Sequence, residues 1–442
     1  MPIFPRLPRR LSPPRLPVPR AATPAAGSPT SRGARLALSA ALLAGLSAAG
    51  AQSTPRAAPI KIGMSAAFTG ASAGLGTEYY RGAKAYFDEV NAGGGVGGRR
   101  LQLVALDDAY QPTQAVTNTV QLIEREKVFA LFNYVGTPTL TAALPVLKSL
   151  GTQQISLIGN LTGAQVQRTL PYSSDVFNIR PSYREEMEAQ VEQLWAAGFR
   201  KFGVFYQLDA YGRSGTDAVA RALAKRGARI TAEATYRRGA TADADMGAAM
   251  RHLREADVEV VLCTGAYQGV AAFIRSARDA SWGVPITNLS FVSADNLLEL
   301  LQASGRQRGR DYTQALFNTQ VVPSYADTRY AGVREYRQLM DKWKPQLPAT
   351  LRDKTYKPAA YSFVGLEGFL NAKVIVHALR ASGSPLTQAR FRSALERTSK
   401  LDLGLAEPVS FSRDRHQGLQ QVYLTAVKGG RWVTVDRWNA AP

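Results

Sequence analysis

The sequence predicts an α/β protein built from two lobes, each with its own mostly parallel sheet. Three observations lead to this fold class. Strand and helix patterns alternate from residue 60 onward, the alternation begins again near residue 180, and the last part of the chain does not start a third series. Repeated β-α units of this length indicate parallel sheets that are covered by helices on both faces.

The first series runs from residue 60 to residue 159. Its order is strand 60–68, helix 77–92, strand 101–106, helix 112–126, strand 128–135, helix 138–151 and strand 152–159. In the first of these helices Tyr79, Ala83, Phe87 and Val90 recur at steps of three and four. This spacing predicts one apolar helix face that packs on the sheet.

A glycine-rich segment between the first helix and the second strand contains the pattern G-x-G-x-x-G, at Gly93, Gly95 and Gly98. In a dinucleotide site a strand precedes these glycines, and the phosphates sit on the N-terminus of a following helix. Here a helix precedes them and a strand follows. A helix C-terminus presents unpaired carbonyls and a partial negative charge, so the segment is interpreted as a helix cap and turn.

The second series begins with an S-x-x-E capping box at Ser182 and Glu185, and Gly198 ends the helix that follows. Three more helix and strand pairs follow, at 215–227 with 228–236, 246–256 with 258–265, and 269–283 with 284–292. Two consecutive series of this kind predict two lobes.

The rest of the chain is expected to complete these lobes. It offers a strand at 316–323, helices at 330–343 and 362–383, a short helix to about residue 397, and a strand pair at 419–427 and 431–438. The turn Lys428-Gly429-Gly430 joins the strand pair as a hairpin. The chain should therefore cross between the lobes more than once.

The first 51 residues have a different composition. Residues 1–30 are rich in Pro, Arg and Ala and are expected to be disordered. Arg32 and Arg35 then precede an apolar run from Leu36 to about Ala49, which is too short to span a bilayer. This is the pattern of a secretory signal peptide, with cleavage expected after Ala51 and a periplasmic location for the mature chain.

The formal charge of +20 raises the question of nucleic-acid binding. Seven arginines lie in the segment to be removed, and the other basic residues are scattered, which favours a solvated basic surface. The single cysteine, Cys263, lies in an apolar strand pattern, so no disulfide is expected. The three histidines stand apart from acids, and no nucleophile or phosphate motif is present, so we expect no enzyme, metal or cofactor.

Five segments resemble one family: IKIGMSAAFTG, the stretch from GAKAYFDEVN to DDAYQPTQAV, VFNIRPSYREEM, FGVFYQLDAYGRSG and PAAYSFVGLEGFLNAKVIVHAL. They resemble periplasmic binding proteins of leucine/isoleucine/valine-type ABC importers, across residues 59 to about 426. The resemblance implies type I periplasmic binding protein architecture, with two Rossmann-like lobes hinged by three crossovers. It places the first lobe at 60–179 plus about 318–405, and the second at 180–317 plus about 406–442.

Thr137 is the best candidate for a ligand contact on local grounds. A strand ends near Val135, Thr137 suits an N-cap and Pro138 suits the first helical position, so a helix N-terminus opens at the carboxyl edge of the sheet. Free N–H groups there could hold a carboxylate. The alternative is that Thr137 only caps its own helix. The resemblance matches Thr137 to a ligand-binding hydroxyl of the family.

Four more site residues follow from the resemblance alone: a second hydroxyl, Thr162; aromatic residues of the second lobe, Tyr211 and Tyr267; and an acid for an ammonium group, Asp295. Asp209 is the alternative acid. A turn, a loop tyrosine and an N-cap are the plain structural alternatives for these positions. Leu75 stands where some leucine-binding members have tyrosine, and the disulfide of those members is absent.

The resemblance also implies a ligand and partners. A zwitterion could bridge Thr137 and Asp295 across the cleft, so the expected ligand is a small amino acid or a related carboxylate or amide. Aromatic or aliphatic acids remain the alternative ligands. The expected partner is an inner-membrane ABC permease complex, with no nucleic acid and a monomeric state, although a sensor subunit for a membrane receptor would have the same lobes.

Overall fold

The computed structural model describes residues 57–150 and 155–438. The proposed leader, residues 1–51, lies outside the described residues. Within the described part, no helix combines the length and the apolar character that a membrane crossing requires.

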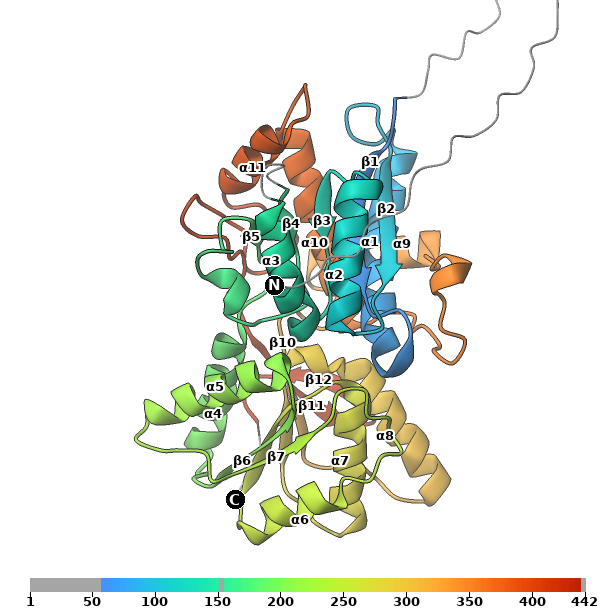
Figure 1. The fold of residues 1–442 in the computed structure, drawn as a ribbon. Helices are drawn as coiled ribbons and strands as arrows, with labels where there is room; N and C mark the ends of the chain where they lie inside the picture. The colour runs from blue at the N-terminus through green and yellow to red at the C-terminus, as the bar shows by residue number, and fades with distance from the viewer. Residues whose placement is uncertain (1–56, 151–154, 439–442) are drawn as a thin grey trace, which may run out of the picture. The chain divides into compact units, whose positions relative to one another are not determined.

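In the described part of the chain, the first lobe is built on a five-stranded sheet with the strand order β2-β1-β3-β4-β5, and all of its strand pairs are parallel. Its strands are β1 Ile60–Ala66, β2 Leu101–Asp107, β3 Ala130–Phe132, β4 Leu157–Ile158 and β5 Val176–Phe177. Its helices are α1 Ala73–Ala92, α2 Pro112–Val120, α3 Thr137–Ser149, α9 Ala331–Trp343, α10 Phe363–Ala381 and α11 Gln388–Glu396. In Figure 1, α2 and α3 pack together on one face of the sheet, and α1 and α10 on the other.

A seven-stranded sheet of described strands organises the second lobe, in the order β12-β11-β10-β9-β8-β6-β7. Its strands are β6 Phe202–Gln207, β7 Ala232–Tyr236, β8 Val260–Thr264, β9 Ile286–Asn288, β10 Leu316–Gln320, β11 Tyr423–Lys428 and β12 Arg431–Val435. Its helices are α4 Tyr183–Ala196, α5 Ala210–Ala224, α6 Gly247–Glu255, α7 Tyr267–Asp279 and α8 Ala294–Arg308. Among the described strands of this sheet, β11 pairs antiparallel with both β10 and β12, and β11 and β12 form the expected C-terminal hairpin.

Alternate residues of the first sheet reach two separate apolar cores. Leu131 of β3 and Leu157 of β4 join a cluster with the apolar side chains of α3, while Phe132 and Ile158 join the cluster on the α1 and α10 side. Successive side chains of a strand point to opposite faces, so a strand buried on both faces is apolar at every position. This explains the uninterrupted apolar runs in the sequence.

Several local predictions are confirmed. Ser182 and Glu185 form both hydrogen bonds of the capping box at the start of α4. The glycine-rich segment joins the end of α1 to β2, with Gly95 in the left-handed region at φ 82°, and its amide donates to the carbonyl of Val90. Cys263 lies buried in β8.

Both returns of the chain come later than predicted. The strand β10, expected to begin the return to the first lobe near residue 318, pairs with β9 and β11 in the second sheet, so this crossing follows Gln320. The third crossing was expected near residue 405. It follows Phe411 instead, because the ring of Phe411 still packs against Phe177 of β5 in the first lobe. The first and third crossings then run together, since Gly418 donates to the carbonyl of Asn178. Apolar patterning marks strands but does not indicate which sheet accepts them.

Candidate functional site

The N-terminus of α3 opens at the carboxyl edge of the first sheet, as predicted, but its cap differs from the prediction. Gly136, at φ 101°, is the N-cap, and Thr137 is the first helical residue. Without a side chain, glycine adopts this backbone conformation at little cost. The backbone N–H groups of Thr137 and Thr139 have no hydrogen-bond partner among the described residues. They are the donors that a helix N-terminus leaves for an anion.

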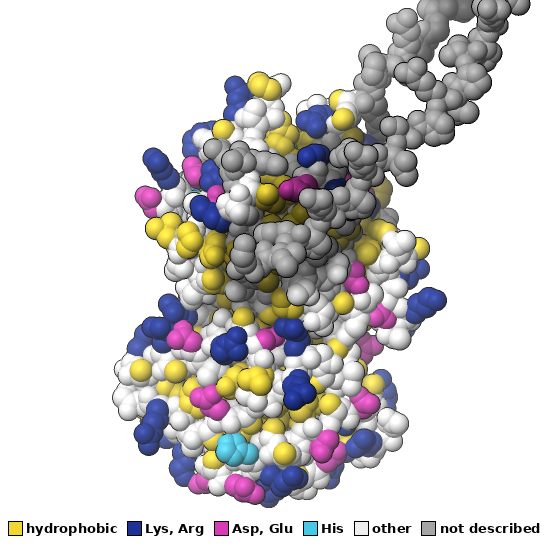
Figure 2. Space-filling view, viewed as in Figure 1, with side chains coloured by type: hydrophobic (Ala, Val, Ile, Leu, Met, Phe, Trp, Pro, Cys, Tyr) yellow, Lys and Arg dark blue, Asp and Glu magenta, His cyan; other side chains and the backbone are white. Residues whose placement is uncertain are grey.

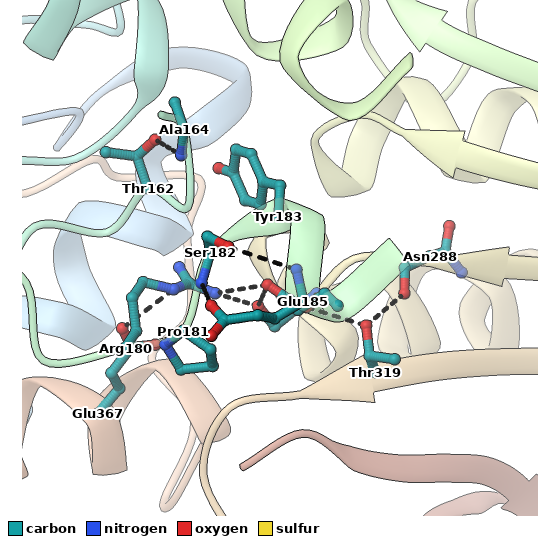
Figure 3. Close-up of polar contacts among 12 residues, drawn as sticks. Thr162, Ala164, Arg180, Pro181, Ser182, Tyr183, Glu185, Asn288, Thr319 and Glu367 are labelled. Atoms are coloured by element: carbon teal, nitrogen blue, oxygen red, sulfur yellow. Dashed lines mark hydrogen bonds and ion pairs between the residues drawn. The ribbon is translucent and has the colours of Figure 1, made fainter. Parts of the chain in front are cut away.

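The Thr137 hydroxyl does not cap its own helix. It lies 2.7 Å from the hydroxyl of Thr162 in the loop after β4, and 3.5 Å from the hydroxyl of Tyr183 at the start of α4. Figure 3 shows the hydrogen bond that the Thr162 hydroxyl accepts from the amide of Ala164, with Tyr183 beside this pair. The structure thus brings two predicted residues, Thr137 and Thr162, together with a tyrosine that follows the first crossing.

A groove of about 320 Å³ opens beside these hydroxyls. It is lined by residues of both lobes: Thr137, Thr141, Gly163, Ala164, Gln165 and Val166 from the first, and Tyr183, Arg184, Ala210, Arg213, Ser214 and Asp217 from the second. We call this the Thr137 groove. Its size matches the lower end of cavities that hold small molecules.

Aromatic side chains pack behind the groove. The ring of Tyr211 lies 5.3 Å from that of Tyr183 and 4.5 Å from that of Phe291, and Phe291 also contacts Tyr110 of the first lobe at 6.2 Å. The Tyr211 side chain is fully buried, and its hydroxyl has no hydrogen-bond partner among the described residues. Burial raises the pKa of Tyr211 well above its usual value, so the hydroxyl stays protonated and available as a donor.

Three of these aromatic residues were missed by sequence reasoning. Tyr110 stands at φ 62° in the turn after β2, Tyr183 follows the capping serine, and Phe291 lies in the 3-10 turn η5 Ser290–Val292. Each is adjacent to a turn or cap that the sequence marks clearly. Nothing local indicates that the three side chains converge, because they come from different lobes.

Tyr267 and Asp295 lie elsewhere on the boundary between the lobes. The hydroxyl of Tyr267, at the start of α7, accepts the amide of Gly74 in α1. Asp295 is not the N-cap of α8, which is Ser293. Its carboxylate accepts the Tyr325 hydroxyl and the backbone amide of Phe363, each at 2.9 Å. Neither residue lines the Thr137 groove.

Burial raises the pKa of Asp295 to about 7, although its two hydrogen bonds oppose the rise. The alternative acid, Asp209, is also occupied. It is the N-cap of α5, accepting the amide of Tyr211 at 2.9 Å, and its other oxygen meets the side chains of Gln207 and Arg238. The two acids considered for an ammonium group thus both hold protein donors.

Below the hydroxyls, a buried ion cluster occupies the first crossing. Figure 3 shows Arg180 between Glu367 of α10 and the start of α4. Its guanidinium lies 3.3 Å from Glu186 and 3.6 Å from Glu367, and it donates to the hydroxyl of Ser290. Burial raises the pKa of Glu367 to about 7, although the charge of Arg180 opposes the rise. Arg180 therefore joins the two lobes through charge as well as through the backbone.

A larger cavity, of about 580 Å³, lies beside the first and third crossings. None of the five predicted site residues lines this cavity, and neither does the N-terminus of α3. Arg168, one of four arginines that line the cavity, already donates to Gln417 and to the carbonyls of Arg180 and Pro181. We therefore assign the candidate ligand site to the Thr137 groove.

The described residues 57–150 and 155–438 hold no metal-binding cluster, and the face in Figure 2 has no continuous basic patch. No group of three or more His, Cys, Asp or Glu side chains there is placed to hold a metal ion. On the face viewed in Figure 2, the described Lys and Arg side chains are interspersed with Asp and Glu. Such mixing does not build the continuous positive field that attracts a polyanion.

Comparison with known proteins places this chain in a family. A family model described as periplasmic binding protein matches residues 59–431. The crystal structure of a possible leucine/isoleucine/valine-binding protein from Rhodopirellula baltica is 30% identical, has a TM-score of 0.76, and covers 87% of this chain and 98% of that chain.

Two curated relatives agree. Leu/Ile/Val-binding protein homolog 7 of Brucella suis is 27% identical over 355 residues, which is 78% of this chain and 81% of that protein. An amino acid binding protein of Pseudomonas aeruginosa is 29% identical over 248 residues, 55% of this chain. That match spans 62% of the Pseudomonas protein, which is less than two thirds of its length.

Proposed function

Because the chain belongs to the periplasmic binding protein family, we propose that it captures a small carboxylate-bearing solute in the Thr137 groove and delivers it to an ABC importer. The names of its relatives make a branched-chain amino acid the first ligand to test. The proposal includes export by the leader of residues 1–51, a periplasmic location, a monomeric state and an inner-membrane permease as partner. It includes no chemical conversion of the ligand.

One observation carries the proposal: the N-terminus of α3 has two amides without a partner among the described residues, and it also bears a hydroxyl that belongs to a cluster of three. The amides belong to Thr137 and Thr139, and the hydroxyls to Thr137, Thr162 and Tyr183. Backbone N–H groups at the positive end of a helix dipole favour a carboxylate. Hydroxyl groups can rotate to donate to its two oxygens. Of these residues, Thr137 and Tyr183 line the groove, one from each lobe.

The aromatic residues behind the donors would contact the rest of the ligand. Tyr183 lines the groove from the second lobe and Thr137 lines it from the first, so one ligand would contact both lobes. Tyr211 and Thr162 pack against these two residues. A ligand favours the closed state only through such differential contacts. The unpaired hydroxyl of Tyr211 supplies a further donor or acceptor. Aromatic and aliphatic acids belong in the same test, since this lining suits them as well.

Thr137→Val tests the proposal because it removes the hydroxyl and nearly preserves the side-chain shape. Loss of a hydrogen bond to a charged group costs roughly 1.5 to 3 kcal/mol, which is about a ten- to hundred-fold weaker affinity. Calorimetric titration of amino acids, amides and aromatic acids measures this, and NMR of the recovered ligand checks that it is unchanged.

Thr117→Val is the matched control, because its hydroxyl is exposed on α2 and bonds only to a carbonyl of its own helix. We expect it to bind as the wild type does. If no carboxylate in the panel binds the wild type, or if Thr137→Val leaves every affinity unchanged, the carboxylate site is not at the N-terminus of α3.

A further inference from the structure

Two helices of the first lobe begin next to hydrogen-bond acceptors of the second lobe. The amide of Gly74, in the first turn of α1, donates to the hydroxyl of Tyr267 at 3.2 Å. The amide of Phe363, the first residue of α10, donates to the Asp295 carboxylate at 2.9 Å. Helix N-termini carry unpaired N–H groups and a partial positive charge, so an acid from another element stabilises them. Both contacts cross from one lobe to the other.

A third contact lies between these two. The hydroxyl of Tyr356, in the segment before α10, lies 3.0 Å from Glu78 of α1 and 3.0 Å from the side-chain oxygen of Asn296 in α8. Gly74 is also essential to this approach. A Cβ at that position would collide with the side chain of Asn296 and with the ring of Tyr356, which would lie at 2.8 Å. The lobes therefore meet here with close steric fit.

We propose that Tyr267, Asp295 and Asn296 form a latch that holds the two lobes closed, and that they contact the first lobe instead of the ligand. The inference rests on the proposed function only in that closure traps a ligand. The Asp295 carboxylate has both oxygens occupied by protein donors, Tyr325 and Phe363. The latch residues lie outside the Thr137 groove, and Tyr267 and Asp295 each accept a backbone amide of the first lobe, so they act on affinity through the lobes.

A latch and a ligand contact predict different results across ligands. The apparent affinity of a ligand that binds only the closed state scales with the fraction of protein in that state. A lost latch contact lowers this fraction and weakens every ligand by the same factor. A lost contact to an ammonium group weakens only those ligands that carry one. Matched ligand pairs with and without the amine separate the two.

The experiment compares Asp295→Ala and Gly74→Ala with the control Glu299→Gln, an exposed acid on the same helix as Asp295. Gly74→Ala leaves the Asp295 carboxylate in place and adds only the Cβ that would separate the lobes. The probes are leucine with 4-methylpentanoate, and phenylalanine with 3-phenylpropanoate. We expect both latch variants to weaken each binding member of a pair equally, by about ten- to hundred-fold, and the control to change nothing.

A loss in Asp295→Ala that is confined to leucine and phenylalanine would overturn the latch and make Asp295 a ligand contact. An equal loss in Glu299→Gln would overturn it as well. Thermal unfolding verifies that each variant is folded. If no probe binds the wild type, the proposed function fails and solution scattering of the free proteins decides. A larger radius of gyration in both latch variants supports the latch, and an unchanged radius overturns it.

Discussion

Replacement of Arg180 by methionine should be among the most damaging single changes to this fold, and its cost should depend on pH. The Arg180 side chain is 1% exposed and lies between two carboxylates, Glu186 and Glu367, whose side chains are 0% and 6% exposed. Methionine fills a similar volume but carries no charge. The two acids would then remain buried without their cation.

Loss of one partner of a buried ion pair typically costs about 3 to 5 kcal/mol, because the remaining charge is uncompensated. Burial already raises the pKa of Glu367 to about 7 and also raises the pKa of Glu186, while Arg180 opposes both shifts. Without Arg180 these pKa values rise further. At pH 8 the folded Glu367 of the wild type is mostly ionised, so folding of the variant must take up a proton that folding of the wild type does not. At pH 5 the folded Glu367 of the wild type is already protonated, so the loss of Arg180 adds less cost there.

Urea unfolding at pH 5 and pH 8 measures this difference. We expect Arg180→Met to lose about 3 to 5 kcal/mol at pH 8 and clearly less at pH 5. The control Arg221→Met removes an exposed ion pair with Asp217 and should cost under about 1 kcal/mol at both pH values. Equal costs for Arg180→Met at the two pH values would refute the electrostatic account, and a cost no larger than that of the control would refute the structural role.

Two further changes test individual positions. Gly136→Ala should weaken both ligand binding and stability, because the residue has φ 101° and its new Cβ would collide with the ring of Tyr110. Calorimetry and thermal unfolding measure the two effects, and an unchanged affinity would mean that Tyr110 does not contribute to the ligand site. Asp108→Asn should flatten the pH dependence of stability, measured by urea unfolding at pH 5 and 8. Burial raises the pKa of Asp108 to about 7, so wild-type stability falls as pH rises from about 4 to 7, by up to about 4 kcal/mol from this group. Because Glu367 and Asp295 contribute with the same sign, the slope should decrease in the variant without vanishing, and an unchanged slope would contradict the assignment.

The elements could be predicted because their signals are local. The capping box at Ser182 involves residues three apart, and the glycine turn after α1 depends on neighbouring backbone conformations. The strand β5 was not predicted, because it has two residues in the structure and so short a strand leaves almost no pattern of its own. The strand β10 lies in the second sheet because it pairs with β9 on one side and with β11, more than a hundred positions away, on the other. Such pairing is a property of the assembled fold.

Thr137 shows how far a local pattern reaches. The strand end and Pro138 correctly predict a helix N-terminus, because both act on the backbone within one turn. The partner of the Thr137 hydroxyl is Thr162, 25 positions later, and this pairing requires the parallel contact of β3 with β4. The predicted cap was wrong because Gly136 already turns the chain into the helix, which leaves the threonine hydroxyl to bond Thr162 instead of its own helix.

Asp295 and Tyr267 show where sequence reasoning about a two-lobed protein reaches its limit. Polar residues that follow parallel strands reach the crevice at the carboxyl edge of the sheet, which is where ligands bind. In a closed protein the facing lobe occupies the same crevice, and its helix N-termini offer N–H groups that compete with a ligand for the same acceptors. In this structure the amide of Gly74 donates to Tyr267, and the amide of Phe363 donates to Asp295. A residue at the crevice can therefore serve the ligand or the closure, and only the contacts across the two lobes distinguish these roles.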